Sequence, residues 1–426
     1  MRRARPSGNL TQYAPRNRRT RRQSVAQPDG LSRAPSPFLS LSHAPTLPNT
    51  HVPIPERPLS PTDRQRTAFR RDLLDWYDAH KRSMPWRKTD DPYRIWVAEI
   101  MLQQTRVDTV RDYYPHFLDA FPTVEDLAAA ERDEVLKYWE GLGFYARARH
   151  LHEAARHVVD AHDGTVPDTM DAIEDLKGVG PYTAAAVLSI AYQKPHAVLD
   201  GNVTRVLTRV FAVEEDATTG PTQRRLRRLA NDLLDPDRPG DFNQAMMELG
   251  ALVCTPSTPL CDRCPLQKVC RAHDAGTEED YPITPESEPV PHHDIAVGLV
   301  FDNDDQLLIQ RRPDEGLLGG LWEFPGGKQE DGESMEAACR REVKEELGIE
   351  VEGVEPFYTL SHAYSHFKIT LHAFRGRIAS GPPEAREDQP FRWVSVDELD
   401  DYAFPRANRR LIEELERRQA EPSLFD

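Results

Sequence analysis

The chain has 426 residues and a formal net charge of −16, with 38% hydrophobic and 29% charged residues. That length exceeds what one hydrophobic core holds, so we expect two or three domains. No apolar run approaches the ~20 residues of a transmembrane helix, and no secretory signal is present. These features exclude an integral membrane protein and predict a cytoplasmic one.

Residues 1–61 form a basic tail rich in Pro, Ser and Arg, which we expect to be disordered. Residues 1–60 carry a net charge of +8, so −24 remains on residues 61–426. The folded part is therefore strongly acidic, the opposite of the usual charge of a nucleic-acid-binding protein, so any such binding would have to come from local features. We interpret the tail as an extended or misannotated start of the chain; a DNA-attracting arm and an organellar transit segment are the second and third interpretations.

Helical periodicity begins at Thr62-Asp63, a good N-cap pair, and continues to about Asp235. One more helix and four cysteines follow in residues 242–272. We expect a helical domain over 62–273, a linker over 274–291 and an α/β domain over 292–421. The α/β pattern predicts strands at 295–301, 307–310, 367–374 and 391–394, and helices at 334–347 and at the end of the chain.

Asp90-Asp91-Pro92 predicts the start of a helix. In this helix Glu99 is the one acid among eight residues, 95–102, whose other seven are apolar. Burial there would raise the pKa of the carboxyl group and keep it protonated near neutrality, which suits a general acid. From the residues alone, a buried partner for an arginine is an equally good interpretation.

Gly178 and Gly180 permit a tight hairpin between two helices, over residues 174–191. Pro181 then suits the first position of the second helix, whose free N–H groups can bind an anion such as a DNA phosphate. Most Gly-x-Gly turns only separate two structural elements and bind nothing. Asp200 follows one helix later, after the apolar run 197–199.

Cys254, Cys261, Cys264 and Cys270 form a C-x6-C-x2-C-x5-C pattern. Four thiolates within 17 residues suit either tetrahedral zinc or an iron–sulfur cluster, and the spacing alone does not choose between them. Disulfides are disfavoured in a cytosolic protein. Cys339 stands apart within a helix and is expected to be a core residue.

Three acids of the C-terminal domain, Glu342, Glu345 and Glu346, share one face of the expected helix 334–347. Carboxylate oxygens in such a cluster suit Mg²⁺. A solvated acidic face, balanced by neighbouring basic residues, is the alternative. The surrounding residues satisfy every fixed position of the Nudix signature, from Gly327 to Ile349, and so resemble a Nudix hydrolase.

Residues 65–275 resemble the MutY adenine DNA glycosylases in the motifs 84–87, 99–105, 141–147 and 242–246, together with the hairpin and Asp200. The resemblance implies that Glu99 protonates the departing adenine and then activates water, and that Asp200 stabilises the positive sugar. It also implies that Gln104 and Phe144 wedge into the duplex while adenine leaves the stack. Members of this family usually have Tyr at the position of Phe144.

The same resemblance bears on Tyr182 and on the cysteines. In the related endonuclease III glycosylases a lysine stands at the hairpin position of Tyr182 and attacks the sugar, and a tyrosine cannot form that imine. We therefore expect base removal without strand cleavage. The cysteine spacing resembles the 4Fe-4S loop of these enzymes, which implies that residues 254–270 hold a 4Fe-4S cluster, with zinc as the alternative.

In MutY enzymes a C-terminal domain of the Nudix fold recognises 8-oxoguanine with a Phe-Ser-His loop. The Nudix signature of that domain is generally degenerate. Tyr364, Ser365 and His366 match that loop, with Tyr in the first place. The signature in this chain is intact, and residues 321–328 resemble MutT, which destroys 8-oxo-dGTP. Mg²⁺ at the Nudix box is therefore a second expected cofactor.

The sequence thus predicts an all-α helix-hairpin-helix glycosylase domain with an iron–sulfur loop, followed by an α/β Nudix-fold domain. The expected function is excision of adenine opposite 8-oxoguanine or guanine in double-stranded DNA, by a monomer with no membrane partner. A dual enzyme that also hydrolyses oxidised nucleoside triphosphates is the first alternative. A lesion-binding protein without turnover is disfavoured by Glu99 and Asp200, and an endonuclease III-like lyase by Tyr182.

Overall fold

The computed structural model describes residues 61–285, 289–316, 318–364, 367–384 and 389–420. The basic tail 1–60, expected to be disordered, lies outside these ranges. None of the described helices combines the length and the apolar character that a membrane span requires.

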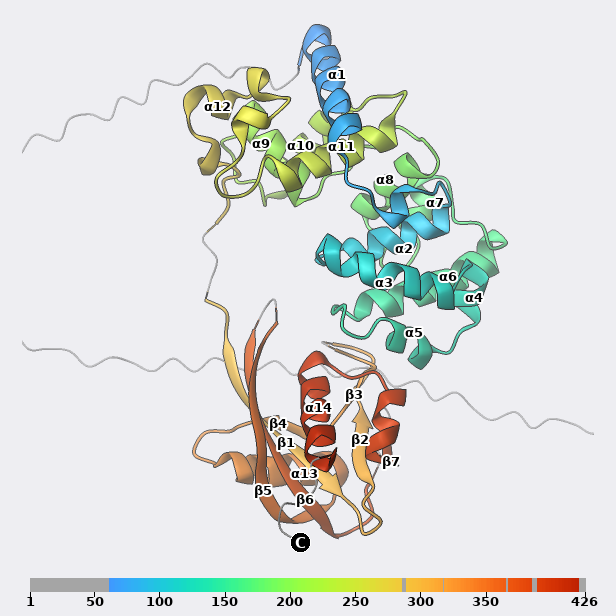
Figure 1. Ribbon diagram of the computed structural model, residues 1–426, viewed down its shortest axis with the longest axis vertical. Coiled ribbons are helices and arrows are strands. Elements are labelled where there is room, and N and C mark those ends of the chain that lie inside the picture. Colours follow the sequence, from blue (N-terminus) through green and yellow to red (C-terminus); the bar gives the residue numbers. More distant parts are fainter. Residues whose placement is uncertain (1–60, 286–288, 317, 365–366, 385–388, 421–426) are drawn as a thin grey trace, which may run out of the picture. The chain divides into compact units, whose positions relative to one another are not determined.

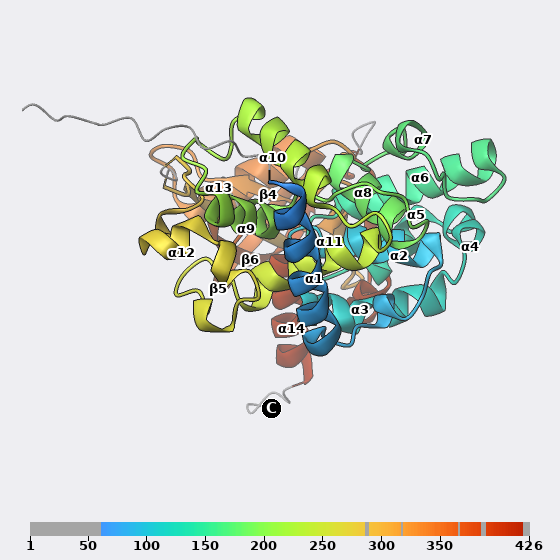
Figure 2. The same ribbon diagram turned by 90° about the horizontal axis from the view of Figure 1, so that it is seen from above.

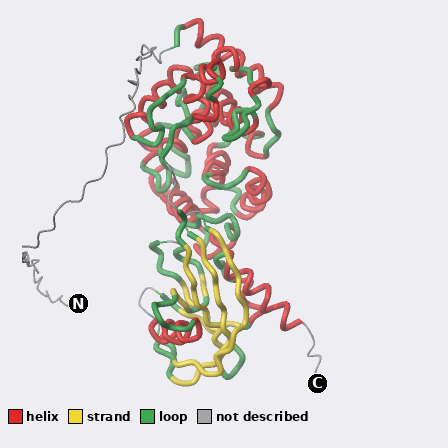
Figure 3. Tube along the Cα trace, turned by 90° about the vertical axis from the view of Figure 1, so that its left-hand side faces the viewer, coloured by secondary structure: helices red, strands yellow, loops and turns green. Residues whose placement is uncertain are grey.

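The described chain is helical up to residue 285 (Figures 1 and 3). Its α-helices are α1 (Asp63–His80), α2 (Pro92–Leu102), α3 (Val107–Ala120), α4 (Val124–Ala129), α5 (Arg132–Tyr138), α6 (Ala146–His162), α7 (Met170–Glu174), α8 (Pro181–Ile190), α9 (Gly201–Phe211), α10 (Gly220–Leu233), α11 (Pro239–Leu252) and α12 (Arg271–Ala275). Short 3₁₀ turns are η1 (Pro85–Arg87), η2 (Cys261–Arg263), η3 (Gln267–Val269) and η4 (Glu278–Asp280).

The first helix begins where the sequence predicts. Thr62 is the N-cap of α1 and forms a capping box with Gln65, which satisfies backbone N–H groups that the first turn leaves free. The buried residues of α1 repeat at helical spacing, and this face packs on α11 (Figure 2).

The helices form two hydrophobic cores. Residues of α2 to α8 build the first, and residues of α1, α9, α10, α11 and the cysteine segment build the second. Helix α8 contributes to both, because Val187 and Leu188 belong to the first core and Ala185 and Ala186 to the second. Helix α8 therefore lies where residues of both cores meet.

The C-terminal region is a mixed sheet with helices on its two faces. Its elements are β1 (His292–Phe301), β2 (Leu307–Arg311), β3 (Trp322–Glu323), β4 (Gly326–Lys328), α13 (Met335–Leu347), β5 (Glu350–Ala363), β6 (Lys368–Ser380), β7 (Phe391–Val394), η5 (Val396–Asp401) and α14 (Arg406–Ala420). The strand order is β3-β2-β1-β6-β5, with β4 also pairing with β1 and β7 with β2. Strands β1 and β6 are parallel, and the other printed pairs are antiparallel.

Alternate residues of β1 face the two helices. Ala296 and Val300 pack with α13, whereas Val297 and Leu299 pack with α14. Cys339 of α13 lies in the first of these cores, as predicted. The predicted strands and helices are confirmed, but the sequence pattern missed β5 and the short strands β3 and β4, and it stopped β6 short of Ser380.

Candidate active site

Glu99 lies on α2, a helix that starts as predicted. Asp91 is its N-cap and accepts a hydrogen bond from the backbone N–H of Tyr93 at 2.9 Å, with Pro92 in the first position. Glu99 is 4% exposed. Tyr182, the second residue of α8, donates its hydroxyl to Oε2 of Glu99 at 2.9 Å. The hairpin residue thus contacts the buried acid directly.

Burial raises the pKa of Glu99 from 4.5 to about 7. The hydrogen bond from Tyr182 opposes this rise, whereas the negative charge of Asp200 adds to it. A carboxyl group with such a pKa carries a proton for much of the time at neutral pH. It therefore has the property that a general acid requires.

Asp200 is the N-cap of α9, and its carboxylate is fixed by two donors. Oδ1 accepts from the backbone N–H of Val203 at 2.7 Å, and Oδ2 accepts from the side-chain amide of Asn202 at 2.9 Å. Capping alone would explain an aspartate here. Asp200 also lines the same cavity as Glu99 and Tyr182, so the two carboxylates and the tyrosine share one site.

A second buried carboxylate, that of Glu248 on α11, lines this cavity and is 1% exposed. Arg82 donates to it from Nη2 at 2.8 Å and Arg87 at 2.9 Å. Burial alone would raise the pKa of Glu248, but the hydrogen bonds from the two arginines outweigh it and hold the pKa at about 2. The cavity therefore contains one carboxyl group that is protonated readily and another that stays charged.

Gln104 and Phe144 occupy tight turns with positive φ angles of 55° and 50°. Non-glycine residues rarely adopt this conformation, and such strain gathers at functional sites. One buried side chain, that of Arg147, connects the two turns. It donates to the carbonyl of Gln103 and to the carbonyl of Gly143 at 3.0 Å, and its guanidinium lies 5.3 Å from the centre of the Phe144 ring.

The two hairpin glycines differ in what they require. Gly178 has a φ of +76°, and an added Cβ would lie 2.6 Å from Cβ of His150, so both conformation and packing demand glycine. Gly180 is the N-cap of α8, and a Cβ there would meet no atom within 4 Å. The fold of the chain therefore leaves open space at Gly180.

A chain of hydrogen bonds joins Asp200 to the cysteine segment. Asn202, which donates to Asp200, accepts from Nη2 of Arg205 at 2.8 Å. Nε of Arg205 donates to the carbonyl of Cys254 at 2.7 Å. Asp200 is thus linked to Cys254, the first of the four cysteines, through the side chains of Asn202 and Arg205.

The four cysteines line one cavity beside the second helical core. The structure thus gathers all four thiols at one place, as the ligands of a single bound group would be.

In the C-terminal region, α13 places two of the three Nudix-box glutamates at a cavity. Glu342 lies against Gly327, and Glu346 accepts from the side-chain amide of Gln310 at 2.7 Å; both line the cavity. Glu345 is more exposed and pairs with Arg341 at 3.3 Å. The structure thus places Glu342 and Glu346 at one cavity, which Glu345 does not line.

Tyr364 directly follows β5 and lines the same cavity. Its ring stacks on Phe367 with a centroid distance of 4.7 Å, and its backbone N–H donates to the carbonyl of Phe367 at 2.8 Å. Ser365 and His366, the other two residues of the predicted reading loop, lie outside the described residues.

Two family models match the chain: the HhH-GPD superfamily of base excision DNA repair proteins over residues 97–232, and the NUDIX domain over residues 296–414. An adenine DNA glycosylase of Rattus norvegicus is 37% identical over 399 residues, which span 81% of this chain and 77% of that protein. Those of Homo sapiens and Schizosaccharomyces pombe are 36% and 35% identical and are covered over 73% and 86% of their lengths. The chain belongs to the adenine DNA glycosylase family. It is a DNA N-glycosylase of base excision repair.

Sequence reasoning missed Glu248 and assigned no role to Arg82 or Arg87, although Arg87 stands in the motif 84–87. The signal was available, because Glu248 is a lone acid between apolar residues of α11, as Glu99 is in α2. It also missed Arg147, whose role depends on two turns that are distant in sequence. That residue stands inside a motif that the resemblance had already marked.

Proposed function

We propose that this adenine DNA glycosylase removes adenine paired with 8-oxoguanine or guanine, with Glu99 as the proton donor. The observation that carries the proposal is the buried carboxyl group of Glu99 in one cavity with Asp200. Breaking the C1′–N9 bond sends its electron pair to the base, and a proton from Glu99 neutralises that charge. Glu99 then takes a proton from the water that attacks C1′.

Asp200 supplies the negative charge that stabilises the oxocarbenium-like sugar. Its carboxylate is held at the start of α9 by donors from Val203 and Asn202, which favour a negative group at that position. Tyr182 orients the carboxyl group of Glu99 through the hydrogen bond between them. Since a phenol forms no imine, we propose a monofunctional enzyme that leaves the strand intact.

For DNA binding we propose separate roles for the hairpin and the two turns. The open space at Gly180 lets a phosphate approach the free N–H groups at the start of α8. Gln104 and Phe144 enter the duplex as wedges, held by Arg147, while the adenine rotates out. Tyr364, with Ser365 and His366, reads the 8-oxoguanine.

We propose that Cys254, Cys261, Cys264 and Cys270, which line one cavity, hold a 4Fe-4S cluster. When bound, the cluster gives the loop its shape. Arg263, Lys268 and Arg271 stand in or next to that loop. We also propose a Mg²⁺ site at Glu342, Glu345 and Glu346, and a monomer located in the cytoplasm.

The direct test is incubation with a duplex containing a single A:8-oxoguanine pair. Alkali should then cut the adenine strand at the excised position on a denaturing gel, and the strand should stay intact without alkali. Duplexes with T:A and A:T pairs at the same site serve as controls. Absence of alkali-sensitive sites in the A:8-oxoguanine duplex would refute the proposed substrate.

A further inference from the structure

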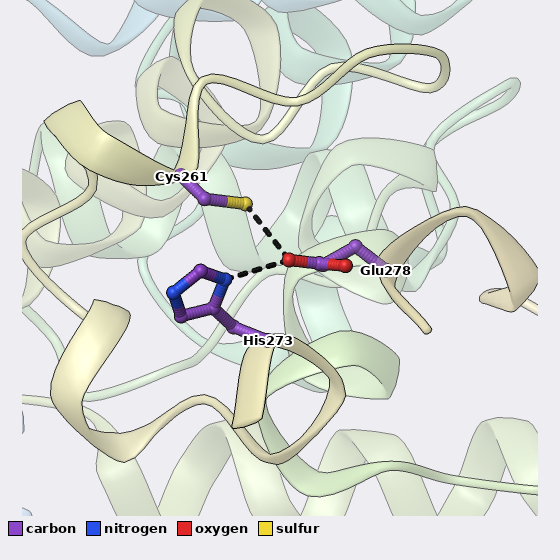
Figure 4. Close-up of side chains that lie close together, drawn as sticks. All are labelled: Cys261, His273 and Glu278. Carbon is purple, nitrogen blue, oxygen red and sulfur yellow. Dashed lines mark hydrogen bonds and ion pairs between the residues drawn. The ribbon is translucent and has the colours of Figure 1, made fainter. Parts of the chain in front are cut away.

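The segment that follows the cysteines, residues 277–283, lies across the cysteine loop; we call it the strap. Its turn η4 places Oε1 of Glu278 at 3.4 Å from Sγ of Cys261. The same oxygen lies 2.6 Å from Nδ1 of His273 on α12, so the carboxylate connects the two side chains (Figure 4). Glu278 and His273 also line the cavity that the four cysteines share.

Three more hydrogen bonds hold the strap, each joining it to a residue elsewhere in the helical domain: Thr258 N–H to Oε1 of Glu279 at 2.7 Å, Arg209 Nε to the carbonyl of Tyr281 at 3.1 Å, and Ala217 N–H to the carbonyl of Ile283 at 2.9 Å. Arg209 is 1% exposed and also donates from Nη1 to Sγ of Cys254 at 3.4 Å. One buried guanidinium therefore holds both the first cysteine and the strap.

Cys261, His273 and Glu278 have the side-chain chemistry of a separate zinc site. Cys261 is, however, one of the four cysteines proposed to hold the cluster, and a thiolate committed to iron leaves Glu278 and His273 without a third ligand. Their contacts with each other and with the cavity wall are better explained by a covering role.

We infer that the strap closes the cysteine cavity, and that Glu278 is the positioning residue that keeps water and chelators from the cofactor. This inference rests on the proposed cluster. Release of iron then requires the strap to open locally, and the hydrogen bond between His273 and Glu278 opposes that opening.

The test is the rate of iron release from the full chain, purified without oxygen and mixed with a coloured ferrous chelator. Loss of the visible absorbance of the cluster is followed in parallel. Glu278→Ala should speed both signals about tenfold, the equivalent of about 1.4 kcal/mol in the opening equilibrium. Glu278→Gln keeps an oxygen that accepts from His273 and should restore a rate within about twofold of the wild type.

Asp280→Asn is the matched control, because it removes a negative charge from the same turn at an exposed residue. It should leave the rate unchanged. If Glu278→Ala does not yield folded protein, Glu279→Ala removes only the bond to Thr258 and should speed release several-fold. Equal rates of iron release from the wild type and the folded Ala variants would overturn the inference that the strap closes the cavity. Zinc in place of iron would refute the proposed cluster. The closing role of the strap would then be tested by the rate of zinc release from the same variants, and equal rates would again overturn it.

Discussion

Replacing Glu99 with Gln should make the protein more stable while removing its proton donor. The pKa of Glu99 rises from 4.5 to about 7 on folding, chiefly because of burial. Each tenfold change in proton affinity corresponds to about 1.4 kcal/mol, so the buried charge costs about 3 kcal/mol above pH 7. Gln carries no charge, and its carbonyl can accept the hydroxyl of Tyr182 in the place of Oε2.

The sign of the pH dependence follows from proton binding. Between pH 4.5 and 7 the folded protein holds the proton that the unfolded chain has released, so the wild type loses stability as the pH rises. Below pH 4.5 the two states bind the proton equally and the penalty vanishes. The difference between Glu99→Gln and the wild type should therefore grow from small at pH 5 to about 3 kcal/mol at pH 8.

Thermal unfolding followed by circular dichroism at both pH values measures this difference. For a domain of this size, about 3 kcal/mol corresponds to a Tm increase of roughly 6–12 °C at pH 8. Glu153→Gln, at an exposed position of α6, is the control and should leave Tm unchanged. Equal Tm values for Glu99→Gln and the wild type at pH 8, or a lower value for the variant, would refute the claim that the buried charge of Glu99 destabilises the fold.

Four further predictions concern strand cleavage, the cofactor, hydrolysis by the C-terminal domain and lesion recognition. Borohydride should trap no stoichiometric enzyme–DNA adduct, because Tyr182 cannot form an imine; efficient trapping with matching strand scission would contradict this. Anaerobically purified protein should contain about four irons and no stoichiometric zinc, and Cys261→Ser should lower DNA binding or folded yield more than the chemical step. The full chain with Mg²⁺ should hydrolyse 8-oxo-dGTP weakly or not at all, and turnover near 1 s⁻¹ that Glu345→Gln abolishes would contradict a reading role. Combined Ser365→Ala and His366→Ala changes should reduce the preference for A:8-oxoguanine over A:G, and an unchanged preference would remove this loop from lesion recognition.

Much of the fold could be predicted because local signals were strong. Thr62 and Asp91 cap α1 and α2 as their sequences indicate, and the apolar spacing of each helix defines its buried face. Strand β5 was missed because charged residues and Gly353 interrupt its alternation, whereas pairing with β6 supplies the order that its own sequence lacks. Tertiary pairing outweighed local propensity at that strand.

The candidate site, too, could be predicted from the sequence only in part. A lone acid in an apolar helix marked Glu99, and the structure places it in one cavity with Asp200 and Tyr182. The contact between Tyr182 and Glu99 spans 83 residues, and those of Glu248 with Arg82 and Arg87 span more than 160. These contacts depend on how the helices pack against one another, and the residue pattern of a single sequence does not predict that packing.

The central claim is that Glu99 gives its proton to the departing adenine. Single-turnover excision from an A:8-oxoguanine duplex, compared between the wild type and Glu99→Gln, tests it most directly. Loss of a general acid costs about 10²–10⁴ in rate, and more when the same group activates water. We predict a loss of at least this size with duplex binding retained. Excision by Glu99→Gln at a rate near that of the wild type would contradict the account.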